Sequence, residues 1–292
     1  MTVSLDALVL PAFDDLEGLP SEAAPWDAHY DLDDSVEVPG APAPVRHDGR
    51  LGVVPTGVGK AAAATTVTAL LSSPEVAFPE PLVLSVGVAG GPPSIPVGSV
   101  VVADTVLDWD DKCRLGGNEL ALNPYTGDRG VFELDPDLVE RARAVGGDID
   151  LREPDVGADV DLREPDLGAG DGEPPSGASP AVLGGVNVCG DELWHGQDMA
   201  GQVEWLLAER AVGPYQVTEM EDAGTAFALS RFGLLDRYLT VRGVSNHDRP
   251  RTGREPRESL FDPAFEAGFG VAVENAVRVA RAVLAERLGS DR

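Results

Sequence analysis

The chain has 292 residues, 43% of them hydrophobic, which is enough to build a sizeable core and excludes a disordered protein. Its 50 acidic residues against 22 lysines and arginines give a formal net charge of −28. Such a surface repels nucleic-acid phosphates and anionic lipid, so we expect neither a nucleic-acid nor a membrane partner. Because salt screens this self-repulsion, we interpret the acidity as adaptation to a salt-rich cytoplasm, as in halophiles.

Residue spacing argues against metal, disulfide and membrane chemistry. Cys113 and Cys189 show no zinc-ligand or CxxC spacing, and the four histidines show none either. We therefore expect no metal and no cofactor. The N-terminus lacks a charged region followed by an apolar block, and the uncharged run 81–103 is interrupted by prolines and glycines. We expect a cytoplasmic protein.

Apolar runs, glycine turns and helical periodicity predict an alternation of strands and helices, which is typical of an α/β sheet. The expected strands are 3–10, 51–55, 82–86, 97–107, 182–188, 215–219 and 238–244, and the expected helices are 61–71, 199–210, 223–232 and 263–288. Residues 13–44 form a polar loop.

A tandem duplication interrupts this pattern. Residues 148–158 (DIDLREPDVGA) are nearly repeated at 159–169 (DVDLREPDLGA), and small and polar residues continue to 180. Two charged, proline-containing copies are too few for a solenoid, so we expect a mobile surface insertion at about 148–180. The chain as a whole, 1–292, is then a single domain.

The densest chemistry lies in Val217-Thr218-Glu219-Met220-Glu221-Asp222. If 215–219 is extended, Glu219 and Glu221 point to the same side and can bind adjacent hydroxyls such as a ribose diol. Met220 offers an apolar surface to a sugar or base. The alternative is structural, because Thr218-x-x-Glu221 also fits a helix capping box.

Two glycine turns could approach a ligand closely. Thr56-Gly57-Val58-Gly59-Lys60 could present the amides of Gly57 and Gly59 to an anion or sugar oxygen, although it matches neither a Rossmann nor a Walker A pattern. Val88, Ala89 and Gly90 follow a buried strand, where ligands of open α/β sheets bind. In both places, glycines that merely serve a tight turn are the alternative.

Two polar loops complete the set. Arg242-Gly-Val-Ser245-Asn246 ends a strand, and the Asn246 amide can donate and accept at once, which suits the N7/O6 edge of a 6-oxopurine. Trp194, followed by His195, could stack on a base. An ordinary polar turn and a buried tryptophan are the respective alternatives.

In this order, these motifs resemble the nucleoside phosphorylase/nucleosidase superfamily, and Trp194-His195-Gly196 with Ser245-Asn-His-Asp-Arg-Pro250 resemble its purine nucleoside permease branch. The resemblance implies a three-layer α/β/α fold around a twisted mixed sheet, assembled as a dimer, trimer or hexamer. It places Glu221 on the ribose 2′ and 3′ hydroxyls, Met220 under the sugar and Asn246 at purine N7. The implied reaction is cleavage of the N-glycosidic bond of a purine nucleoside.

Departures from the pattern leave the nucleophile open. The strand Val83-Leu84-Ser85-Val86 lacks the arginine of related phosphorylases, and Val88 replaces a hydroxyl residue. If phosphate is the co-substrate, Gly57, Gly59 and Arg242 are its expected ligands, with Arg46 and Arg114 as other arginines to consider. If water is, the resemblance implies a carboxylate base in the first loop, Glu17 or Asp14.

Two functions from different classes therefore remain. One is a phosphorylase or nucleosidase that releases a purine base. The other is a nucleoside-binding or transport-associated protein that has lost turnover.

Overall fold

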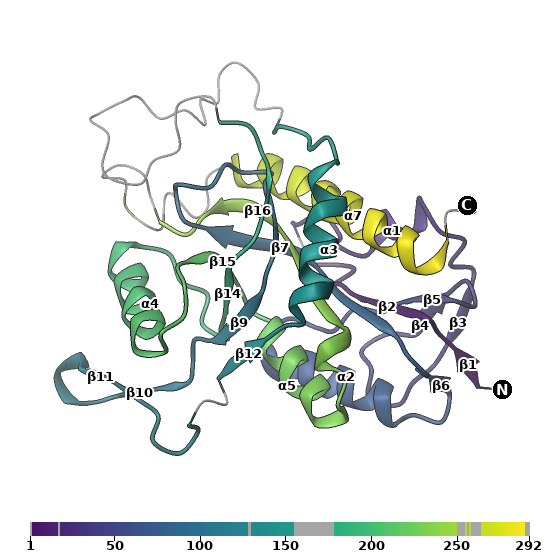
Figure 1. The fold of residues 1–292 in the computed structure, drawn as a ribbon, viewed down its shortest axis with the longest axis horizontal. Coiled ribbons are helices and arrows are strands. Elements are labelled where there is room, and N and C mark those ends of the chain that lie inside the picture. Colours follow the sequence, from purple (N-terminus) through teal and green to yellow (C-terminus); the bar gives the residue numbers. More distant parts are fainter. Residues whose placement is uncertain are drawn as a thin grey trace.

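The computed structural model describes residues 2–16, 18–127, 130–154, 178–249, 255, 257 and 264–289. In this part of the chain, 12 strands form one mixed sheet with helices on both faces (Figure 1). The strands are β2 (Ala7–Leu10), β3 (Asp34–Val36), β4 (Val45–His47), β5 (Leu51–Val53), β7 (Leu82–Gly91), β8 (Val100–Val102), β9 (Thr105–Asp108), β12 (Val131–Glu133), β13 (Val182–Leu183), β14 (Val186–Cys189), β15 (Tyr215–Glu219) and β16 (Tyr238–His247).

Two small sheets flank the large one within the described residues. They pair β1 (Val3–Ser4) with β6 (Val76–Ala77), and β10 (Lys112–Arg114) with β11 (Leu120–Leu122). The helices are α1 (Ala24–Asp27), α2 (Lys60–Ser72), α3 (Pro136–Gly147), α4 (Gln197–Glu209), α5 (Asp222–Phe232) and α7 (Ala264–Leu288), with short 3₁₀ turns η1 (Gly116–Asn118) and η2 (Leu235–Arg237).

The alternation of side chains along β16 separates the two helical layers. A methyl group at Gly243 would collide with the backbone of Ala272 in α7, so this residue faces α7. Its neighbour Arg242 points the other way and reaches Asp222 at the start of α5. On that second face α5 packs closely on α2, because Gly224 approaches the carbonyl of Lys60. The α/β/α layering expected from the resemblance is present.

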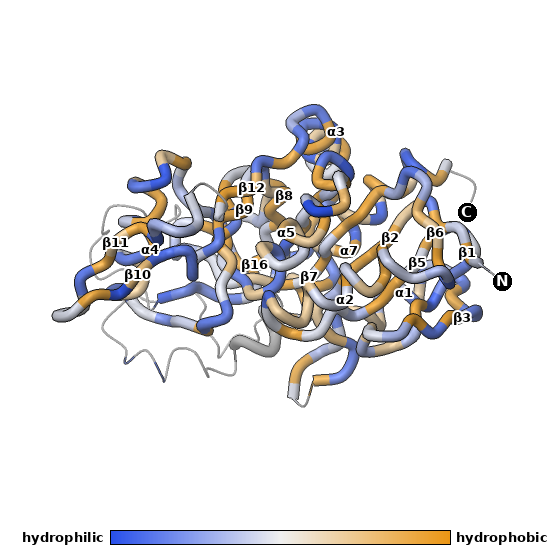
Figure 2. Tube along the Cα trace, turned by 90° about the horizontal axis from the view of Figure 1, so that it is seen from below, coloured by the Kyte–Doolittle hydropathy of each residue, from blue (hydrophilic) through white to orange (hydrophobic). Residues whose placement is uncertain are grey.

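The core lies between these layers. Strands β2, β7 and β16 and helix α7 supply many of its buried aliphatic side chains, and Figure 2 shows β2 and β7 as largely hydrophobic. A second cluster, around Trp109, Trp194 and Tyr215, lies between α4 and the strands β9, β14 and β15. This second cluster supports the loops that follow β14 and β16.

Strand β7 is paired with two different strands along one of its edges, and a gap is left between them. β2 pairs with Leu82 to Ser85, and β15 pairs antiparallel at Gly90, while β16 runs along the other edge. Between Ser85 and Gly90, β7 therefore has an edge without a strand partner. Such switch points are where open α/β sheets bind ligands.

Several predicted strands are divided or extended. The expected strand 97–107 is two strands, β8 and β9, separated at Ala103–Asp104, and 182–188 is interrupted at Gly184–Gly185, where Gly185 has a φ of 142°. The Gly87–Gly91 segment, expected as a turn, continues β7 as strand because β16 pairs with it throughout. Single-sequence periodicity does not register such long-range pairing.

Of the expected insertion at about 148–180, the structure describes residues 148–154 and 178–180, and residues 155–177 lie outside the described chain. Residues 148–154 contact α7: the backbone N–H and C=O of Arg152 bond to the Asn275 amide at 2.9 Å each, and the Asp150 carbonyl accepts from Arg278. The first residues of the expected insertion are thus attached to the core.

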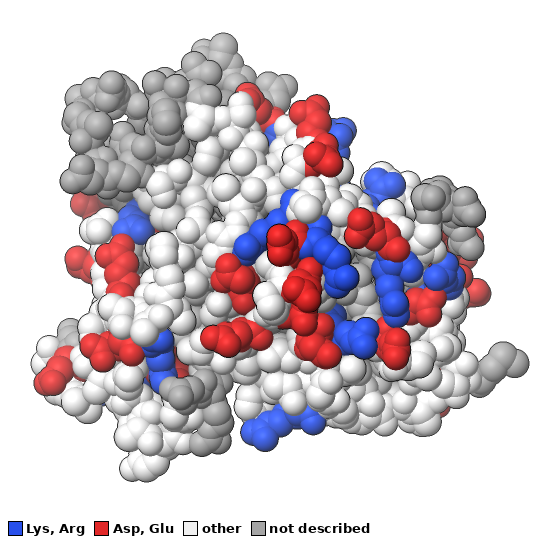
Figure 3. Space-filling view, viewed as in Figure 1, with Lys and Arg blue, Asp and Glu red and all other residues white. Residues whose placement is uncertain are grey.

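Charged side chains cover the outer helices. On the face seen in Figure 3, acidic and basic side chains alternate over the region of α3 and α7. Among the described residues, no helix combines the length and apolar character needed to cross a membrane.

Candidate functional site

The Glu219-Met220-Glu221 motif lies where β15 passes into α5. Glu219 accepts hydrogen bonds from the backbone N–H of Glu221 (2.7 Å) and Asp222 (2.9 Å), so it is Glu219 that caps α5. Glu221 makes no side-chain cap to its own helix, and the capping box expected of Thr218 and Glu221 is not formed. This arrangement releases Glu221 for another role.

Glu221 instead reaches the neighbouring helix α2 on the same face of the sheet. Its Oε1 accepts from the N–H of Gly59 at 3.0 Å, at the N-terminus of that helix. The next amide, of Lys60, donates to Asp191 Oδ1 at 2.7 Å. Gly59 has a φ of 95°, which a side chain rarely adopts, so glycine permits this turn. Glu221 is only 5% exposed, and its second oxygen, Oε2, faces Arg242.

Arg242 lies beneath both glutamates and is 1% exposed. Its Nη2 is 3.0 Å from Glu219 Oε2, and its Nη1 is 3.6 Å from Glu221 Oε2. Asp222 binds the same guanidinium through both of its carboxylate oxygens, and Ser85 Oγ accepts from Nη2 at 2.8 Å. The guanidinium is thus surrounded by oxygen atoms.

Glu22, which precedes α1, occupies the open edge of β7. Its two oxygens accept from the N–H groups of Val88 and Ala12 at 2.8 Å each, and its carboxylate lies where a side chain at Gly87 would collide with it. It is 2% exposed. Desolvation raises the pKa of Glu22 to about 7, although Arg242 acts in the opposite direction. Glu22 is the group of this cluster best suited to exchange a proton at neutral pH.

The other carboxylates divide into two classes. Burial raises the pKa of Glu219 to about 8, and burial also raises the pKa of Glu221, although Arg242 opposes it. Asp222 is equally buried, but contact with Arg242 holds its pKa below the usual value. Asp222 is therefore the ionised partner of Arg242, and the glutamates retain protons more readily.

Asn246 lies on the other side of β7, beside Gly90. Ser245 is an extra residue in the pairing of β16 with β7, and this bulge redirects the side chains that follow. Ser245 Oγ donates to Asn246 Oδ1 at 2.8 Å, and Asn246 Nδ2 donates to the His247 carbonyl at 3.0 Å. These bonds fix the orientation of the amide, and each end keeps the capacity for one further bond.

The remaining predicted substrate residues differ in exposure. Met220, Val88 and Gly90 are half-buried around β7, and Ala89 is buried. Trp194 is 8% exposed and packs edge-on against Tyr215 in the second core cluster, whereas Leu193 beside it is 68% exposed. The exposed apolar side chain of this loop is therefore Leu193 and not Trp194.

The groups expected to hold phosphate already have partners. The N–H of Gly57 donates to the Ala12 carbonyl, that of Gly59 to Glu221, and Arg242 contacts carboxylates. Arg114 donates to Gln202 at the β10–β11 hairpin.

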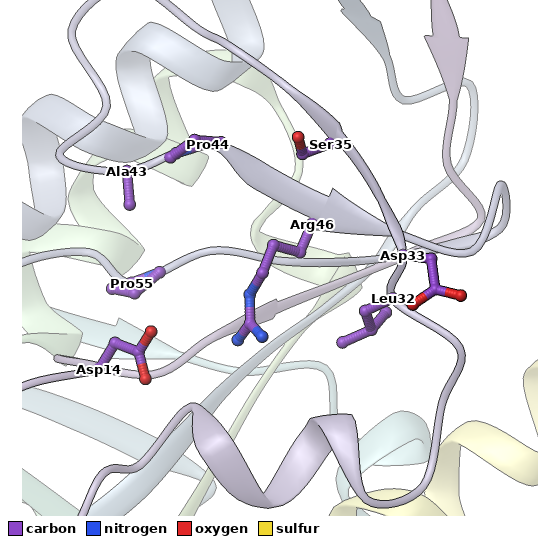
Figure 4. A pocket seen from close by; sticks show the side chains of 8 residues that line it. All are labelled: Asp14, Leu32, Asp33, Ser35, Ala43, Pro44, Arg46 and Pro55. Atoms are coloured by element: carbon purple, nitrogen blue, oxygen red, sulfur yellow. The ribbon is translucent and has the colours of Figure 1, made fainter.

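Arg46 points into a separate cavity of about 300 Å³, seen in Figure 4 between the loops after β2 and β5. Asp14 and Asp33 line the same cavity, and Arg46 pairs with Asp27. Carboxylates so close to the guanidinium disfavour an anion there.

The structure describes only one of the two carboxylates that were expected to act as the base in the first loop. Glu17 lies outside the described residues, and Asp14 accepts from Ser21 Oγ at 2.9 Å. Glu22 was not among the bases predicted from the sequence. Its local signal is Ser21, whose Oγ accepts from the N–H groups of Ala23 and Ala24 at the start of α1 and so fixes Glu22 in the turn.

Comparison with known proteins gives a family and a fold. The model of the purine nucleoside permease (NUP) family matches residues 5–289. No curated protein sequence matches the chain. Futalosine hydrolase of Helicobacter pylori superposes with a TM-score of 0.65 at 18% identity, covering 97% of this chain and 98% of that one.

Two nucleosidase structures give the same result. The 5′-methylthioadenosine/S-adenosylhomocysteine nucleosidase of Colwellia psychrerythraea, in complex with adenine, has a TM-score of 0.63 at 20% identity and covers 98% and 96% of the chains. That of Neisseria meningitidis, with methylthio-immucillin-A, has a TM-score of 0.65 at 16% identity and covers 97% and 99%. At these identities the likeness establishes the fold.

Proposed function

Because the chain belongs to the purine nucleoside permease family and has a nucleosidase-like fold, we propose that it hydrolyses the N-glycosidic bond of purine nucleosides. The observation that carries this proposal is the position of Glu22. A buried carboxyl group with a pKa of about 7 lies within electrostatic reach of both Glu221 and Arg242.

The cluster has the charge that such a cleavage needs. Breaking the bond leaves positive charge on the sugar and negative charge on the leaving purine. Glu221, held by Gly59, binds the 2′ and 3′ hydroxyls and stabilises the cationic sugar. Met220 covers the sugar, and the free N–H of Asn246 bonds to N7, where the purine gains charge.

Glu22 supplies the base. In its ionised form it removes a proton from a water molecule as that water attacks the anomeric carbon. Its pKa of about 7 matches a base that works at neutral pH, when about half of the molecules carry the charge. The amides of Ala12 and Val88 orient the carboxylate for this step.

Charge favours water over phosphate as the nucleophile. The donors expected to bind phosphate are occupied by Glu221, Asp222 and neighbouring oxygens. A phosphate would meet the carboxylates of this cluster without a cation of its own among the described groups, and like charges at this range are unfavourable. Water carries no such penalty.

Release of base from inosine and guanosine tests the proposal. In phosphate-free buffer at molar salt, we expect hypoxanthine or guanine together with free ribose. Calorimetric titration with the same nucleosides provides the second readout. Binding without release of base would establish instead the nucleoside-binding function that the family's name indicates.

A further inference from the structure

Asp222 has a more constrained environment than its neighbours in the site. It is 0% exposed and directly follows Glu221 in the chain. Its Oδ2 accepts from Arg242 Nε at 3.0 Å and from Asn187 Nδ2 at 2.7 Å, and the hydroxyl of Thr240 donates to the same oxygen. The bidentate geometry fixes the plane of the guanidinium from below.

This contact determines how the single positive charge is shared. Asp222 binds Arg242 through two charge-assisted bonds, whereas Glu219 is 3.0 Å and Glu221 3.6 Å from the same guanidinium. The titratable and charged groups that face one another here are Arg242 and Tyr238 of β16, Cys189 of β14, Glu219 of β15, Glu221, Asp222 of α5, and Glu22. Arg242 is the one cation among the described groups of this cluster, so Asp222 competes with the three glutamates for its charge.

We propose that Asp222 is a positioning residue for the cleavage: its two bonds to the guanidinium hold Arg242 beneath the sugar site and draw its positive charge away from the glutamates. The inference rests on the proposed function, in which Glu22 is the base. A purely structural role would require only that the Asp222 carboxylate be hydrogen-bonded, and it would leave the titration of Glu22 unaffected. The pKa of Asp222, which contact with Arg242 holds below its usual value, agrees with this assignment.

The test is a titration of carboxyl carbons by ¹³C NMR in the full chain, because this readout needs no turnover. In the Asp222→Asn variant, Arg242 is shared by the glutamates, so the titration of Glu22 should move to lower pH by about one unit or more. The matched control is Asp111→Asn, which removes a buried carboxylate bound to Arg210 and Thr126 away from the site. The control should leave the Glu22 titration in place.

Wild-type protein provides a second arm if Asp222→Asn does not fold. We expect the Asp222 carboxylate to stay ionised over the whole range in which Glu22 titrates. Protonation of Asp222 in that range, or an unchanged Glu22 titration in Asp222→Asn, would overturn the inference. Absence of nucleoside cleavage by the wild type would contradict the proposed function alone and leave both titrations readable.

Discussion

Two buried arginines of this molecule are surrounded in opposite ways. Among the described residues, Arg210 contacts one buried carboxylate, that of Asp111, which also accepts from the hydroxyl of Thr126. Arg242 is within 3.6 Å of three carboxylates, those of Glu219, Glu221 and Asp222. Glu22 lies close enough to interact as well.

We interpret Arg210 and Asp111 as a structural pair, and the groups around Arg242 as the proposed active site. In the described part of the chain, the charge of Arg210 is matched by that of Asp111. An excess of buried carboxylates costs folding free energy, because burial disfavours the charged form. Such an excess persists where function requires perturbed pKa values, and a cationic transition state is one such requirement.

Loss of the base should have the largest effect. We expect Glu22→Gln to lower kcat/KM by about 100- to 10,000-fold, the usual contribution of general acid–base catalysis. Asp111→Asn, its control at the structural pair, should lower the melting temperature while kcat/KM changes little. Steady-state assays and thermal melts of both variants measure this. Equal losses of kcat/KM in the two variants would abolish the distinction between the regions.

Loss of the sugar ligand should rank second. Charge-assisted hydrogen bonds are worth roughly 1.5–3 kcal/mol each, so Glu221→Ala should cost at least about 100-fold in kcat/KM. The melting temperature should change little, because Glu219 continues to cap α5. A variant that melts much earlier yet cleaves normally when folded would return Glu221 to a purely structural role.

The sequence predicted the parts of this site that depend on local patterns. Strand 215–219 and the turn into α5 follow from alternation and helix periodicity, and they place Glu219 and Glu221 correctly at the end of β15. That Glu219 rather than Glu221 caps the helix could not be predicted. Glu221 is instead bound by the N–H of Gly59, which lies 162 residues away in the chain.

Glu22 also could not be predicted, because its environment is formed by residues that are distant in the chain. Its role depends on the gap between β2 and β15 along β7, and that gap exists only after the sheet has assembled. Strands β3 and β4 and the β10–β11 hairpin were also missed, because they are short and lack strong alternation. Phosphate ligation by Gly57, Gly59 and Arg242 was plausible from composition alone, and partners from distant strands now occupy these groups.

Stability should depend on pH through the functional cluster. The pKa of Glu22 rises from 4.5 to about 7 on folding and that of Glu219 from 4.5 to about 8. Groups with a raised folded pKa stabilise fully below the unfolded pKa, and this contribution is lost as pH rises through the folded value. The unfolding free energy in molar salt should therefore fall between about pH 4.5 and 8. Denaturant titrations should show a shallower slope for Glu22→Gln and an unchanged one for Asp111→Asn.

Salt should distinguish the surface from the buried cluster. At a net charge of −28, repulsion between surface groups acts over a Debye length of about 30 Å at 0.01 M salt and about 3 Å at 1 M. The melting temperature should climb with potassium chloride, and any oligomer should dissociate at low salt. The pH at which Glu22 titrates should hardly move, because buried charges are little screened. A melting temperature independent of chloride would contradict the halophilic interpretation.

The origin of the nucleophile tests the central claim most directly. A single turnover of inosine in H₂¹⁸O containing excess phosphate separates the two reactions by mass spectrometry of the sugar. The arrangement of carboxylates around Arg242 predicts ¹⁸O at the anomeric carbon of free ribose at every phosphate concentration. Ribose 1-phosphate, increasing with phosphate and free of ¹⁸O, would contradict it.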